Sequence, residues 1–226
     1  MESDSDQATE GQGSPALIKE DDMKRHLISA CFALAALAVL MGCGGAVKYP
    51  NYYTLHVPPP PDPPAQEGVH ASLAVREFRS PTYLRQGAIV YKTSPEQIGF
   101  YDYHRWAVDP CEFVTNAVAE RLRASGKFTQ VKLYDGRSDL DYVLSGRLEK
   151  LEEVDYGGAV KVEVAISAQM TSLATGATVW TNEVSEVGTV EQRNVPAVVA
   201  EMDATMGRAI EKLLTPAPAA AGIQKD

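Results

Sequence analysis

The chain has few of the residues that enzymes use for metal or thiol chemistry. Its 226 residues include only three cysteines and four histidines, and the histidines are dispersed along the sequence. No HExxH or CxxC spacing occurs, and there is no glycine-rich phosphate loop. Three cysteines cannot build a disulfide framework. We therefore predict a protein without catalytic residues, without a metal site and without a cofactor.

Basic side chains are also few. The chain has 21 lysines and arginines against 30 aspartates and glutamates, for a formal net charge of −9. A nucleic-acid-binding protein needs a basic face, so this balance argues against nucleic acid as a partner. The length fits one medium-sized domain with appended segments.

An apolar run near the N-terminus indicates export. Leu27 to Met41 are interrupted only by Ser29 and follow Lys24 and Arg25. Fifteen residues in a helix rise about 22 Å, which is less than the roughly 30 Å of a bilayer core. A short apolar run behind two cations is typical of a secretory signal peptide, which we place at residues 23–42.

The run ends in Leu40-Met41-Gly42-Cys43, which resembles a bacterial lipobox. Small Gly42 leaves the peptidase room at the scissile bond, and the thiol of Cys43 is the atom that would accept diacylglycerol. Met41 departs from the small residue usual at its position. We predict lipidation at Cys43, with an ordinary signal peptide and a chance cysteine as the alternative. Residue 44 is glycine and not aspartate, which by the rule for Gram-negative lipoproteins favours the outer membrane.

The remaining appendages are defined by composition. Residues 1–22 carry seven acidic residues and one lysine, which opposes the positive-inside rule, so we interpret them as a mis-assigned upstream stretch or a disordered extension. Residues 43–69 form a lipidated N-terminus with a proline-rich tether. Residues 70–214 form the folded domain, and residues 215–226 a disordered tail.

Local patterns predict two helices and a meander in the domain. Asp109, Pro110 and Glu112 form an N-terminal capping pattern for a helix over about 110–125. A second helix begins near Pro196, with its methionines as core filler. Strict alternation of apolar residues from 160 to 170 indicates a strand with one buried face. Together with turn signals it predicts an antiparallel meander over 142–190.

The segment from 91 to 106 is unusually rich in aromatic residues. Regular pleating would put Tyr101, Tyr103 and Arg105 on one face and Trp106 on the other, in the core. Tyrosine and arginine are enriched at interfaces, so we predict that Tyr101, Tyr103 and Arg105 bind a partner. We interpret Cys111 as an inert buried thiol. Four acidic residues are interpreted as a solvated strand end: Glu149, Glu152, Glu153 and Asp155.

Several motifs in order resemble a known family. After the lipobox come Tyr52-Tyr53-Thr54-Leu55, then Ile89 to Ser94, then Phe100 to Trp106, and later Tyr142 to Gly146. The series is similar to the ABC-type transport auxiliary lipoprotein family, whose members are PqiC-like. The resemblance extends over nearly all of residues 43–214.

The resemblance implies a fold, a location and partners. The fold would be a single-domain α/β sandwich with a mixed, mostly antiparallel sheet flanked by two main helices. The function would be that of a non-enzymatic, outer-membrane-anchored periplasmic subunit of a system that transports lipids or hydrophobic compounds. Its partners would be an MCE-domain protein and ABC or PqiA-like membrane components, with a homo-oligomer left open. The alternative is an envelope lipoprotein that regulates or scaffolds another periplasmic machine, such as cell-wall synthesis.

Overall fold

The computed structural model describes residues 16–41, 47–56, 69–136 and 139–215, in two units divided after Lys48. The first unit contains one helix, α1 (Ala16–Met41). No helix in the described ranges is both long and apolar enough to span a membrane. The predicted lipidation site Cys43, most of the proline-rich tether and nearly all of the tail lie outside the described residues.

The second unit is built on one mixed sheet of eight strands, whose central strand is β6 (Tyr142–Val154). Along one edge of β6 lie two antiparallel strands in succession, β7 (Lys161–Ser172) and β8 (Thr178–Thr189). These three strands form the predicted meander. The other edge of β6 is shared by strands from earlier in the chain. Those strands are β2 (Val69–Val75) with β5 (Phe128–Leu133) at the start of β6, and β3 (Ala88–Lys92), β4 (Ile98–Trp106) and β1 (Asn51–Tyr53) at its end.

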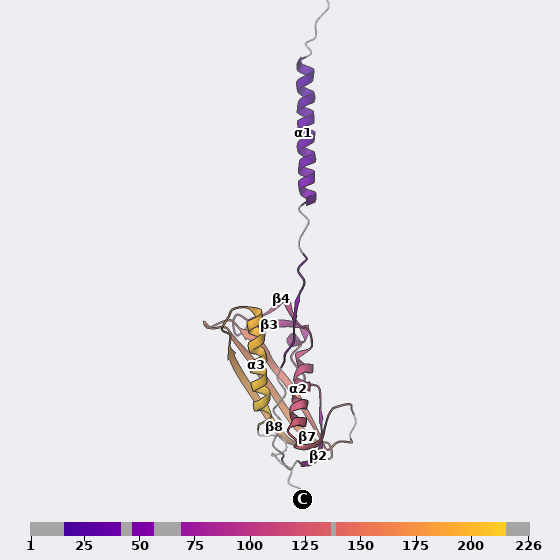
Figure 1. The fold of residues 1–226 in the computed structure, drawn as a ribbon, viewed down its shortest axis with the longest axis vertical. Coiled ribbons are helices and arrows are strands. Elements are labelled where there is room, and N and C mark those ends of the chain that lie inside the picture. Colours follow the sequence, from indigo (N-terminus) through magenta and orange to yellow (C-terminus); the bar gives the residue numbers. More distant parts are fainter. Residues whose placement is uncertain (1–15, 42–46, 57–68, 137–138, 216–226) are drawn as a thin grey trace, which may run out of the picture. The chain divides into compact units, whose positions relative to one another are not determined.

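Two helices cover the same face of this sheet (Figure 1). Helix α2 (Pro110–Ala124) packs on β5, β2 and β6, and α3 (Val195–Leu213) packs on β7 and β8, so the two helices meet side by side. The side chain of Asp109 caps α2 by accepting a hydrogen bond from the Cys111 amide at 2.8 Å. The capping pattern in the sequence therefore predicted α2 correctly, and the α/β sandwich with two main helices is confirmed.

The core lies between the sheet and the two helices. On β7 the even-numbered apolar residues are buried, as their alternation predicts, and Met202 and Met206 of α3 are fully buried against them. Cys111 is buried as expected, and its burial raises the pKa of the thiol. The strand β2 ends at Val75, and farther along the chain the Phe78 amide donates to the Thr115 hydroxyl on α2.

The ring of Phe78 packs against the backbone of β6 at Gly146, which has no side chain. A Cβ atom built on Gly146 would collide with this ring, and Phe78 is itself buried. We expect Gly146→Ala to lower the free energy of unfolding by about 1–3 kcal/mol, the usual cost of overpacking a core. Denaturant unfolding measures this. Combining it with Phe78→Leu should cost less than the sum of the two single changes, and strict additivity would contradict the contact.

Candidate functional site

The predicted partner-binding segment surrounds a hollow of about 360 Å³ on β3 and β4. We call it the tyrosine hollow. Aromatic side chains form most of its wall, and acidic side chains from the end of β6 close it. Its lining consists of Tyr91, Thr93, Phe100, Tyr101, Asp102, Tyr103, His104, Glu153 and Asp155.

The strand β4 is irregular at the tyrosine hollow. Arg105 pairs with Ala88 and Phe100 pairs with Val90, so five residue steps on β4 oppose only two on β3. The extra residues form a large bulge, which breaks the alternation of side chains between the two faces. As a result the Tyr101 ring meets the His104 ring edge-on, at 5.6 Å between centroids.

The bulge gathers the aromatic rings into one contact network. Tyr91 packs on Tyr101 at 5.0 Å between ring centroids, and Tyr53 of β1 packs on His104 at 5.7 Å. The Tyr53 hydroxyl and Nδ1 of His104 are also hydrogen-bonded at 2.9 Å. Gly99 leaves the space that the Tyr91 ring occupies, since a Cβ there would meet the ring. The network fixes the wall of the hollow from three strands.

A buried carboxylate lies at the base of the tyrosine hollow. Glu153 is only 5% exposed, and one of its oxygens accepts a hydrogen bond from the Tyr101 hydroxyl at 2.8 Å. Burial raises the pKa of Glu153, with the Tyr101 hydrogen bond acting against this increase. Burial and the adjacent carboxylate raise the pKa of Tyr101 as well. Tyr101 is therefore a neutral donor that holds Glu153 in place.

The neighbouring glutamate is buried on the opposite face of the sheet. Glu152 is 2% exposed; it lies 3.7 Å from the ammonium of Lys92 and accepts a hydrogen bond from the Tyr83 hydroxyl at 3.4 Å. Burial and the negative charge of Glu152 raise the pKa of Tyr83 to about 12. The prediction of a solvated strand end is therefore wrong for these two glutamates. Their partners come from β3, β4 and residue 83, which spacing along β6 could not reveal.

The three residues predicted to bind a partner have different environments. Tyr103 is 42% exposed, whereas Tyr101 is half-buried and bonded to Glu153. Arg105 donates to the carbonyl of Gln86 at 2.7 Å. Regular pleating would put Tyr101 and His104 on opposite faces, and this part of the expectation is wrong, because the bulge brings the two rings into contact. Trp106 is buried, as predicted.

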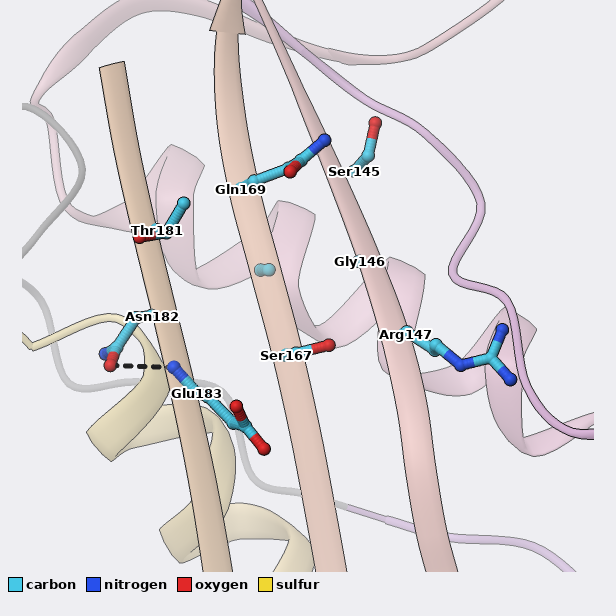
Figure 2. A pocket seen from close by; sticks show the side chains of 9 residues that line it. Ser145, Gly146, Arg147, Ser167, Gln169, Thr181, Asn182 and Glu183 are labelled. Carbon is cyan, nitrogen blue, oxygen red and sulfur yellow. Dashed lines mark hydrogen bonds between the residues drawn. The ribbon is translucent and has the colours of Figure 1, made fainter. Parts of the chain in front are cut away.

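A second hollow, of about 560 Å³, lies on the sheet face that the helices leave uncovered. Figure 2 shows Ser145 and Arg147 from β6, Ser167 and Gln169 from β7, and Thr181 and Glu183 from β8 across three neighbouring strands. The side chains are polar. Arg147 extends from β6 and Glu183 from β8, the two strands on either side of β7. We call this surface the polar sheet face.

The family model for the ABC-type transport auxiliary lipoprotein component matches residues 53–213. The match covers the sheet except the first two residues of β1, both covering helices and the tyrosine hollow. The chain therefore belongs to this family, as its motifs indicated.

Solved structures agree with the fold. Protein XCC0632 from Xanthomonas campestris superposes with a TM-score of 0.62 at 17% identity, over 73% of this chain and 92% of that one. A second crystal structure, of an uncharacterized protein, gives a TM-score of 0.58 at 15% identity, over 74% and 98% of the two chains. At these identities the likeness shows the fold alone. No curated protein matches the chain.

The burial of Glu153 leads to a prediction about pH. A carboxyl group whose pKa is raised in the folded state favours folding at low pH, and this contribution is lost as the pH rises through the raised value. We expect Glu153→Gln, which can still accept from Tyr101, to be stabilised relative to wild type near pH 8. That advantage should shrink steadily on acidification to the ordinary value of 4.5.

Denaturant unfolding of both proteins across this pH range measures the difference. Glu191→Gln, at an exposed position, serves as the matched control and should show no such trend. An advantage of Glu153→Gln that is independent of pH would contradict the buried, charged carboxylate.

Proposed function

We propose that the protein is a periplasmic subunit of an envelope transport system, anchored to the outer membrane by lipid on Cys43. It works with an MCE-domain protein and ABC or PqiA-like membrane components that move lipids or other hydrophobic compounds. Its own contribution is non-enzymatic: it binds the other subunits and keeps them near the membrane. Family membership over residues 53–213 and the lipobox in the sequence support this proposal.

The observation that carries the proposal is the exposed aromatic edge formed by β1 and β4. Tyr52 lies opposite Arg105 in the parallel pairing of these strands, and Tyr103 precedes Arg105 by two residues. Both tyrosines are exposed, and large exposed aromatic residues beside arginine are typical of interface centres. A tyrosine held on a strand loses little side-chain entropy on binding. This edge therefore offers an anchor for a protein partner.

Variants of two neighbouring residues separate binding from folding. Tyr103→Ala should weaken binding to the MCE-domain partner by about tenfold or more, since interface tyrosines often contribute about 2 kcal/mol. Its melting temperature should change little. Trp106→Ala should lower the free energy of unfolding by about 3–5 kcal/mol, because the indole is buried. Pull-downs and thermal melts of both variants measure the two effects.

Tyr101→Ala gives a further control. Because Tyr101 holds Glu153, its loss should reduce stability more than the loss of Tyr103 does. Unchanged partner binding by Tyr103→Ala would refute the assignment of this surface.

The anchoring step is tested separately. Cys43→Ser removes the thiol that accepts diacylglycerol, so we expect an unprocessed precursor and complete loss of lipid labelling. Each buried CH₂ contributes about 0.8 kcal/mol, so several acyl chains hold a protein firmly while one chain binds only marginally. Membrane fractionation and labelling with a radioactive fatty acid report the outcome. Persistent labelling of Cys43→Ser would show that the lipobox assignment is wrong.

A further inference from the structure

The strand β8 leaves a long edge of the sheet open. It pairs with β7 along one side, and none of the other described strands pairs with its second side. Proteins usually protect such edges with short strands, lysines, prolines or bulges, because unpaired backbone groups attract further strands. β8 is 12 residues long, and its sequence TVWTNEVSEVGT contains no lysine, arginine or proline.

The alternation of backbone hydrogen bonds along β8 identifies the residues whose amides and carbonyls point away from β7. The Val190 amide donates to the Val160 carbonyl at 3.0 Å, and antiparallel partners alternate between bonded and non-bonded pairs. The register with β7 is unbroken from Thr189 back to Trp180, so even-numbered residues bond to β7. Odd-numbered residues therefore direct their amides and carbonyls to the open edge.

Glu183 confirms this alternation, because its outward amide already has an acceptor that does not lie on β7. Its amide donates to Oδ1 of the preceding Asn182 at 2.9 Å, a contact drawn in Figure 2. An amide bonded to β7 would not be available for this contact. Beyond Glu183, the outward amides of Ser185 and Val187 have no acceptor among the described residues. The open backbone thus extends from the Glu183 carbonyl to Thr189.

The side chains along this edge define the chemistry of an occupant. Glu183 and Val187 are four residues apart on the face that the helices leave uncovered, and Val187 is 53% exposed. Glu183 also borders the polar sheet face in Figure 2. An added strand would place one side chain beside Val187 and another beside Glu183. An apolar residue fits the first position and a basic residue the second.

Neither a second copy nor the proline-rich segment fits this edge well. Two β8 strands paired antiparallel about their centres would put the two Glu183 side chains opposite or diagonal to each other on one face, which is unfavourable for like charges. Residues 57–68 contain six prolines and two acidic residues. Proline cannot donate to a sheet, so this segment cannot supply the missing bonds.

We propose that the β8 edge from Glu183 to Thr189 binds an extended segment of another protein, which adds to the sheet as a further antiparallel strand. The segment carries an apolar residue opposite Val187 and a lysine or arginine opposite Glu183. Backbone bonds supply affinity and this pair of side chains supplies selectivity. The proposal is independent of the transport role and of the aromatic edge on β1 and β4.

A peptide with this pattern tests the proposal. The probe is Ac-TVTVTKT-NH2, whose first valine and lysine are four residues apart, and the matched probe Ac-TVTVTET-NH2 reverses the charge. Amide hydrogen exchange is followed by NMR on the full chain in detergent micelles. We expect the lysine peptide to slow exchange at Ser185 and Val187 at least tenfold, and the glutamate peptide to bind at least tenfold more weakly.

Two variants complete the test. Glu183→Lys should reverse the preference between the two peptides, and Ser185→Pro should abolish binding while leaving the bonds to β7 intact, because its amide faces outward. Equal protection by both peptides, or protection confined to other strands, would overturn the proposal. Protection of Ser185 and Val187 that increases with protein concentration without peptide would overturn it in favour of a second copy. Protection lost on removing residues 216–226 would assign the edge to the chain's own C-terminus instead.

Discussion

The fold depends on β6 being paired along both of its edges. This strand of 13 residues bonds to β7 along its whole length on one side and is shared by β2 and β3 on the other. Among the described strands, no other one pairs with strands of both the N-terminal half of the domain and the meander. β2 and β3 both run parallel to β6 and occupy successive parts of the same edge, so the chain between them continues along that edge, and Arg79 bridges to Arg147 within that interval. Because Gly146 has no side chain, the Phe78 ring can pack directly against the β6 backbone at this point.

The same pairing explains why two adjacent carboxylates are buried. Once β3 pairs with the end of β6, Glu152 and Glu153 lie in the interior of the sheet and point to opposite faces. A buried charge is costly unless it is paired or hydrogen-bonded. Each glutamate accordingly accepts a hydrogen bond from a tyrosine hydroxyl, from Tyr83 on one face and from Tyr101 on the other. The position of Tyr101 in the tyrosine hollow thus follows partly from the hydrogen bond that the buried Glu153 carboxylate needs.

Sequence patterns predicted the local elements well and the long-range contacts poorly. The capping pattern at Asp109 and the alternation from 160 to 170 depend on neighbouring residues, and both elements are present. The roles of Tyr101, Glu152 and Glu153 depend on which strands become neighbours, which single-strand periodicity does not encode. The β4 bulge is the clearest case, because regular pleating separated Tyr101 from His104 whereas their rings are in contact in the structure. Only the excess of aromatic residues indicated that this segment was special.

The topology keeps the two exposed edges apart. At the end of β6 the strands run in the order β1, β4, β3, β6, β7 and β8, so the aromatic edge on β1 and the acidic edge on β8 border opposite sides of one sheet. The two edges also differ in chemistry. β1 has only three residues and presents tyrosine, whereas β8 has 12 residues and presents backbone groups with a carboxylate. A short aromatic edge suits side-chain anchoring and a long edge suits strand addition. The partners proposed for the two edges would therefore not compete for the same backbone groups.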